Sequence, residues 1–347
     1  MKVQIYTDLH CSYTSSILPL YSGESSKFTT RLEMIVNTGR WLSDLAKKEN
    51  VDLIINGGDT FDSIIVKAEE LVAISEFFKC FEEVSCDHYV LVGNHEKVNE
   101  NFNGSEIFSG FKSVHVVDKP KKITDEISLL PYMQEDLITH DLLKTIRGKL
   151  LVSHIDIQGS CLRDSYILDS GVNPEMLAEY FEFVANGHLH TAEKLKTTQN
   201  EVWNIGGVSS ISFVDNQEYI PSCVIFDTET KTFKRYENPY SILFRKISID
   251  TVKDLLLELK KLPENPVVLS IKFSNYEQKV DLQNILDKNS KVLNYKLVNT
   301  VVDPGTESLD LVDVTSLDVK SKFEEFLDTT ELRYEKQDYL NLLKAVN

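Results

Sequence analysis

The sequence predicts an α/β protein in which helices cover a mostly parallel sheet. Apolar runs of strand length alternate with segments whose apolar residues recur at helical spacing, so strand, helix and strand repeat through the first two thirds of the chain. Five of the apolar runs end directly in a short motif rich in Asp, Asn and His. An α/β sandwich with polar loops at its strand ends accounts for both features.

The N-terminal part alternates regularly when it is taken in chain order. Strands are expected at 3–6, 51–56 and 150–154, and helices at 28–49, 67–84 and 135–147. The helix at 28–49 is indicated by Leu32, Ile35 and Leu42, which recur at helical spacing. The helix at 67–84 has an apolar face broader than one sheet contact needs, so it is either a buried helix or a dimer surface.

Beyond residue 190 the pattern changes to short strands, and Asn238-Pro239 predicts the end of the first domain. These strands are expected at 194–197, 201–205, 208–213, 222–227 and 232–236. A second unit then has the order strand, helix, strand, helix, strand, at 243–249, 252–262, 267–273, 278–286 and 292–301. The predicted division is a first domain at 1–240, an α+β capping domain at 241–303, an acidic linker at 304–315 and a helix pair at 316–347.

The helix pair is predicted to bind a partner. Its two amphipathic helices present Phe323, Phe326 and Leu327 among their apolar residues. A pair of helices this small cannot bury both faces on itself.

Candidate ligands for metal ions follow five of the predicted strands. They lie in Asp8-Leu9-His10, Gly58-Asp59, Gly93-Asn94-His95-Glu96, Ser153-His154 and Gly187-His188-Leu189-His190. Because sites in parallel sheets assemble where the carboxyl ends of the strands converge, we expect these side chains to lie together. Two neighbouring divalent ions, which clamp a phosphate between them, would use most of these donors. Mixed oxygen and imidazole donors suit Mn²⁺, Fe²⁺ or Zn²⁺ better than Mg²⁺.

This ordered set of motifs resembles the calcineurin-like metallophosphoesterase superfamily, whose pattern is D-x-H, GD-x-x-D, GNH-[DE], H and GH-x-H. The resemblance implies one ion held by Asp8, His10, Asp59 and His190, and a second held by Asp59, Asn94, His154 and His188. It implies His95 as the catalytic acid that is not a ligand. Asp62 or Glu96 is expected to orient His95, and Asp62 is equally a candidate for a helix N-cap.

The order of domains is similar to that of the SbcD type of DNA repair nuclease. That resemblance implies an exonuclease and endonuclease that depends on Mn²⁺, forms a homodimer and binds an SbcC-like coiled-coil ATPase through its C-terminal helices. Two alternatives remain open: a stand-alone phosphoesterase acting on nucleotides or phosphoproteins, and a scaffold of a DNA repair complex without catalysis. The C-terminal helix pair weighs against the first and the intact ligand set against the second.

Composition limits the function classes further. The net charge of −17 argues against a generally basic nucleic-acid surface, although bound cations or a basic partner can create a local positive field. The five scattered cysteines form no C-x-x-C pair, which indicates reduced thiols. With no apolar run of 18 residues and no signal-peptide pattern, the expected location is the cytoplasm of a bacterium or of a phage-infected cell, without a membrane span.

Overall fold

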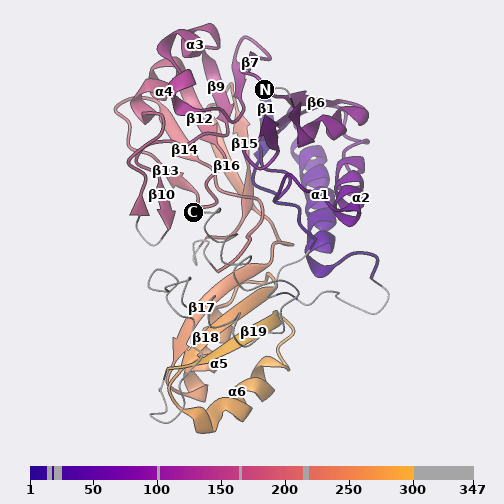
Figure 1. Cartoon of the computed structure of the whole chain (residues 1–347), viewed down its shortest axis with the longest axis vertical. Coiled ribbons are helices and arrows are strands. Elements are labelled where there is room, and N and C mark those ends of the chain that lie inside the picture. Colours follow the sequence, from indigo (N-terminus) through magenta and orange to yellow (C-terminus); the bar gives the residue numbers. More distant parts are fainter. Residues whose placement is uncertain (14–17, 19–25, 100–101, 164–165, 214–218, 301–347) are drawn as a thin grey trace, which may run out of the picture. The chain divides into compact units, whose positions relative to one another are not determined.

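The computed structural model describes residues 1–13, 18, 26–99, 102–163, 166–213 and 219–300. Met1–Asn299 cluster as one compact unit, which contains all the elements discussed below. The predicted linker and helix pair at 304–347, with Phe323, Phe326 and Leu327, lie outside the described residues. Two six-stranded sheets and a three-stranded sheet form the framework of the described part (Figure 1).

The first six-stranded sheet carries three of the five metal-ligand motifs. Its order is β16-β15-β1-β2-β3-β6, and its strands are β1 (Lys2–Tyr6), β2 (Leu53–Asn56), β3 (Asp87–Leu91), β6 (Val114–Val117), β15 (Ser222–Asp227) and β16 (Thr232–Glu237). Strands β1, β2, β3 and β6 are parallel, with Val3 opposite Leu53, whereas β15 and β16 pair antiparallel. The carboxyl ends of β1, β2 and β3 therefore lie at one edge.

The second six-stranded sheet carries the other two motifs. Its order is β13-β14-β12-β9-β8-β7, with β7 (Lys121–Lys122), β8 (Ile127–Leu130), β9 (Gly148–Ser153), β12 (Phe181–Asn186), β13 (Glu193–Lys194) and β14 (Glu201–Asn204). Strands β8, β9, β12 and β14 are parallel. Ser153 is the partner of Asn186 at the ends of β9 and β12, so the loops that follow these strands start side by side.

Four layers result from the way in which the two sheets bury their apolar faces. Alternate residues of both sheets, among them Ile5, Leu91 and Val152, form one shared core. Helices α1 (Thr30–Glu49) and α2 (Ala68–Lys79) cover the other face of the first sheet, and α3 (His140–Thr145) and α4 (Pro174–Tyr180) that of the second. The predicted α/β sandwich is confirmed (Figure 1).

The elements of the expected capping unit are also present. A parallel sheet is formed by β17 (Leu243–Ile249), β18 (Val267–Phe273) and β19 (Val292–Asn299), with helices α5 (Val252–Lys261) and α6 (Lys279–Leu286). Apolar residues of this sheet, such as Leu269 and Ile271, bury against the helices. Phe244 and Val268 instead join the core that contains α1 and α2. The division at residue 240 stays a prediction.

Two predicted elements differ from the structure, and one helix was missed. Instead of one helix at 135–147 there is a 3-10 turn (Glu135–Leu137), and α3 begins only at His140, because the Thr139 side chain accepts a hydrogen bond from the Leu142 N–H and caps it. Residues 208–213 form no strand, since Val208 N–H donates to the Thr7 carbonyl in a loop beneath the strand ends. Helix α4 was not predicted.

Helix α2 resolves the two interpretations of its apolar face. Ala73, Ile74, Phe77 and Phe78 are buried against α1 and the first sheet, as expected of a buried helix. Val72, on the same helix, stays 44% exposed. The remaining short elements are β4 (Lys97–Asn99), β5 (Phe102–Asn103), β10 (Cys161–Arg163), β11 (Tyr166–Ile167) and the 3-10 helices Gly104–Gly110 and Tyr276–Gln278.

Candidate metal centre

All seven predicted metal ligands come together at the carboxyl ends of the strands. Each lies one to four residues beyond its strand: Asp8 and His10 after β1, Asp59 after β2, Asn94 after β3, His154 after β9, and His188 and His190 after β12. Six of them, with His95, form three overlapping clusters, and within each cluster the potential ligand atoms lie within 4.8 Å of one another. Both sheets thus contribute to one site.

The first cluster contains Asp8, His10 and His190. The Nε2 atoms of His10 and His190 are 3.0 Å apart, and His10 Nε2 lies 3.8 Å from an oxygen of Asp8 and 3.8 Å from one of Asp59. Nitrogen and oxygen lone pairs converge here without enough protons to join them all. A cation between these atoms satisfies them together.

Asp59 also belongs to the second cluster, with His154 and His188. His154 Nε2 lies 3.2 Å from Asp59 Oδ2 and 3.1 Å from Asn94 Oδ1, while His188 Nδ1 lies 3.0 Å from the same amide oxygen. An ionised carboxylate has two oxygens and can face two ions at once. Asp59 is shared by the group with His10 and His95 and the group with His154 and His188.

Asp8 gives the clearest sign that a cation belongs in the site. Its side chain is fully buried, and neither carboxylate oxygen has a hydrogen-bond partner among the described residues. A buried carboxylate without a partner is strongly destabilising unless a positive charge compensates it. The residues present therefore fit divalent ions on structural grounds.

A hydrogen bond behind His154 and an ion-pair contact behind His10 fix which nitrogen of each ring faces the clusters. His154 Nδ1 lies 2.7 Å from the Gly57 carbonyl, and His10 Nδ1 lies 3.2 Å from a carboxylate oxygen of Asp62. These contacts hold the proton at Nδ1 and leave the Nε2 lone pair of each ring for a metal. Asp62 thus acts on His10 through its side chain. It is not a helix N-cap, since Lys67 is the residue before α2.

Asp156 is a site residue that the sequence did not assign. Its carboxylate oxygen lies 3.0 Å from His188 Nε2, which orients the opposite nitrogen, Nδ1, toward Asn94. A carboxylate behind a metal-binding imidazole is a recurrent arrangement in metalloproteins. The only available signal was its position two residues after His154, which many loop carboxylates share.

His95 forms a third cluster with His10 and Asp59, and its side chain is more accessible than theirs. Its side chain is 35% exposed, and its Nε2 lies 3.9 Å from Asp59 Oδ2. Its Nδ1 lies 2.7 Å from the backbone carbonyl of Asp62, which fixes the ring with Nε2 on the opposite side. The backbone N–H of His95 donates to Asp59 Oδ1 at 3.1 Å and positions the ring against the candidate bridging ligand.

Glu96 does not orient His95, contrary to the expectation. Its carboxylate oxygens accept the backbone N–H groups of Phe61 at 2.7 Å and Gly93 at 2.9 Å, and so tie the β2 loop to the β3 loop. The Glu96 side chain is buried in the protein, since the residue is only 1% exposed. Burial, together with the charge of Asp59, raises the pKa of Glu96 to about 8.

The charges at the centre are coupled through Asp59 and His154. Burial raises the pKa of Asp59, but the neighbouring His154 outweighs this effect and holds that pKa well below its usual range. Burial likewise lowers the pKa of His154, but the Asp59 carboxylate overcomes this and raises it to about 9. Without metal, His154 is therefore protonated near neutral pH, and a bound ion must displace that proton.

The backbone at the site adopts conformations that L-residues rarely take. Asp8, His10, Asp59 and His188 have φ values of 53°, 46°, 52° and 73°. The left-handed region is sparsely populated for residues with a side chain, and such residues concentrate at functional sites. Half of the eight non-glycine residues with positive φ in the described part are candidate ligands.

Histidines outside the motifs have structural partners, as expected. His88 Nε2 bonds the Tyr6 hydroxyl at 2.9 Å in the buried core, and His115 contacts Asp87 at 2.9 Å. His140 lies 3.0 Å from the Tyr180 hydroxyl. All five cysteines are free, and burial raises the pKa of the Cys11 thiol, which belongs to none of the clusters.

The chain belongs to the calcineurin-like phosphoesterase family, whose sequence model matches residues 1–192. Within that class it is similar to the DNA double-strand break repair protein Mre11 of Saccharolobus solfataricus. The two are 23% identical over 311 residues, which cover 79% of this chain and 77% of the relative. The family implies a metal-dependent phosphoesterase, and the clustered ligands agree with divalent ions.

Two solved structures are also similar. A dimetal phosphatase from Danio rerio matches 68% of this chain and 96% of its own, with 10% identity and a TM-score of 0.42. An archaeal phosphodiesterase matches 68% of this chain and 99% of its own, with 16% identity and a TM-score of 0.35. In the part of the chain that the structure describes, no helix is both long and apolar enough to cross a membrane.

Proposed function

We propose that this protein is a DNA nuclease that hydrolyses phosphodiester bonds with two divalent ions. Mn²⁺ is the metal we propose, one of those that suit mixed oxygen and imidazole donors. One observation carries the proposal: Asp59 joins two ligand clusters, and His95 stands beside them with an accessible ring. Similarity to Mre11 over most of both chains supports DNA as the substrate.

The residues take distinct roles in this proposal. Asp8, His10, Asp59 and His190 hold one ion, and Asp59, Asn94, His154 and His188 hold the other. When bound, the ions would supply an activated water and offset the negative charge that develops on the phosphate. Asp62 and Asp156 orient His10 and His188 from behind.

His95 acts as the general acid. With its Nδ1–H donated to the Asp62 carbonyl, a protonated His95 presents its Nε2–H on the accessible side of the ring. That proton can pass to the oxygen that leaves the phosphate. An imidazole suits this step because its ordinary pKa lies near neutrality.

Partners and location belong to the same proposal. Similarity to a DNA double-strand break repair protein supports action in a repair complex. An SbcC-like ATPase bound by residues 316–347, a homodimer and a cytoplasmic location stay predictions. The exposed apolar residues Ile64, Ile65 and Val72, at and before helix α2, offer a surface for a second copy.

The test replaces His95 with alanine. We expect the variant to bind the same number of Mn²⁺ ions as the unaltered protein, because His95 is not a ligand, while cleavage of DNA and of bis(4-nitrophenyl) phosphate falls about 10²- to 10⁴-fold. Metal content is measured by elemental analysis after gel filtration. His115→Ala, which removes an exposed histidine outside the clusters, is the matched control.

Three outcomes separate the possibilities. Loss of an ion in His95→Ala would contradict the assigned role. A protein that cleaves nucleotide esters but not DNA would support the stand-alone phosphoesterase instead. A protein that binds Mn²⁺ and DNA but cleaves neither substrate would favour the scaffold.

A further inference from the structure

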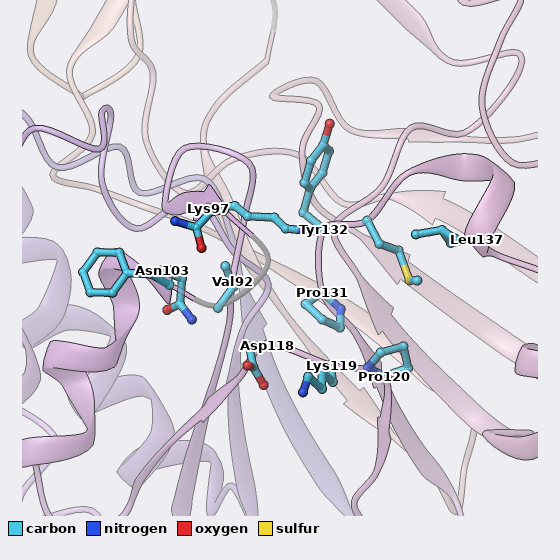
Figure 2. Close-up of a pocket in the computed structure, with 12 residues that line it drawn as sticks. Val92, Lys97, Asn103, Asp118, Lys119, Pro120, Pro131, Tyr132 and Leu137 are labelled. Carbon is cyan, nitrogen blue, oxygen red and sulfur yellow. The ribbon is translucent and has the colours of Figure 1, made fainter.

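A pocket lies next to the candidate metal centre and is used by none of the roles assigned so far. It is formed where β3, β6 and β8 end, by the loops that follow these strands. Figure 2 shows Lys97, Asn103, Asp118, Lys119 and Tyr132 around it. Its lining comes from three separate parts of the chain, so the pocket depends on the tertiary fold and not on one local turn.

The pocket and the metal centre share structural elements. Val92, in the pocket wall, immediately precedes the Gly93-Asn94-His95 motif, and its carbonyl accepts the Tyr132 N–H at 2.9 Å. The Tyr132 ring lies 6.1 Å from the ring of His188, measured between centroids. A molecule in the pocket is therefore close to whatever is bound at the metals.

Asn103 indicates that the pocket has a ligand. The residue is only 6% exposed, yet its side-chain oxygen has no hydrogen-bond partner in the part of the chain that the structure describes. Asn103 occupies the position before the 3-10 helix Gly104–Gly110, but its side chain makes no capping bond there. A buried amide oxygen left unpaired is destabilising, and a ligand that donates a hydrogen bond to it would remove that penalty.

The other lining residues define the chemistry of that ligand. Val92, Pro131 and Leu137 give apolar surface, and Phe102 and Tyr132 add two aromatic rings. Phe102 is 52% exposed, so part of its side chain is open to a ligand. A flat, partly apolar molecule with N–H donors on its edge fits these surfaces.

We propose that this pocket binds one unpaired nucleobase of the strand whose phosphate lies at the metal centre. Asparagine amides recognise the donor and acceptor edge of bases, and aromatic rings stack on their faces. Lys97 and Lys119 in the lining give local positive charge to a chain of net charge −17. The Asp118 carboxylate favours a base with an amino group over a second phosphate.

This proposal rests on the proposed nuclease function and refines its substrate. A base that reaches Asn103 cannot remain stacked and paired, because its hydrogen-bonding edge must face the pocket. The enzyme should therefore act best where the strand is single or frayed. The bound base would determine which phosphate of the strand lies at the ions.

The experiment measures binding of dAMP and of 2-deoxyribose 5-phosphate, which lacks the base, to the full chain with Mn²⁺ by calorimetry. We expect dAMP to bind at least about 10-fold more tightly. Asn103→Leu and Phe102→Ala should each reduce this preference to about 3-fold or less, while hydrolysis of bis(4-nitrophenyl) phosphate stays unchanged. Asn37→Leu, on helix α1 and outside the pocket, is the control.

Thermal unfolding separates a binding role from a structural one. Since the Asn103 oxygen is unpaired, Asn103→Leu should unfold at the same temperature or higher, whereas a structural asparagine would lower it. Equal binding of the two probes, or a preference that survives in both variants, would overturn the proposal. DNA cleavage without base preference would overturn the pocket alone, and base preference without DNA cleavage would overturn the nuclease function alone.

Discussion

Gly93→Ala tests the metal centre through a single methyl group. A Cβ atom built on Gly93 would lie 2.1 Å from Asp59 Oδ1 and 2.5 Å from the Asp59 nitrogen. An ordinary non-bonded contact between heavy atoms is about 3.5 Å, so the loops that follow β2 and β3 must separate by roughly 1 Å. Metal sites tolerate about 0.2 Å in ligand distance. The displaced atom belongs to the residue that joins both clusters.

We expect Gly93→Ala to weaken Mn²⁺ binding at both positions and to reduce phosphodiester cleavage about 100-fold. The metal-free protein should lose about 1–3 kcal/mol of unfolding free energy from the added volume and still fold. Titration calorimetry gives the affinities, and thermal unfolding checks the fold. Gly110→Ala is the control, because a Cβ there would meet nothing within 4 Å. Unchanged affinity for two ions in Gly93→Ala would refute the bridging position of Asp59.

Three further predictions address single groups. Asp59→Ala should lose both ions, and near-stoichiometric metal in that variant would rule out a shared bridging carboxylate. Asp156→Asn should weaken the binding of one ion about 10- to 100-fold and leave the affinity for the other unchanged, as two separate calorimetric transitions would show. An equal loss of affinity at both positions would mean a general distortion. Because the pKa of His154 is raised to about 9, protons compete with metal below that pH. Affinity should fall by up to about tenfold per pH unit from pH 9 to 7, with release of protons on binding, and a flat profile would contradict this.

The sequence predicted the ligands because each follows an apolar strand, and parallel strand ends must converge once the sheet forms. It could not assign Asp156, because many loop carboxylates lie two residues from a ligand motif, and it could not place Tyr132, whose loop carries no such motif. The expected strand at 208–213 was wrong for a related reason. Its apolar residues suit a strand, but Ser209 Oγ donates to the Leu9 carbonyl at 2.7 Å and binds the segment to the β1 loop.

The loops that hold the ligands are fixed to one another by the protein itself. Beyond the ends of β1 and β2, Asp8 N–H donates to the Gly58 carbonyl and His10 N–H to the Asp59 carbonyl, each at 3.0 Å. These bonds hold both loops in left-handed conformations that cost about 1–3 kcal/mol per residue. The surrounding sheets therefore offset the cost of these backbone conformations in the absence of metal. An ion would bind candidate ligands that are already arranged. Binding of ions should accordingly stabilise the fold, since it pairs the buried Asp8 carboxylate without requiring the loops to move.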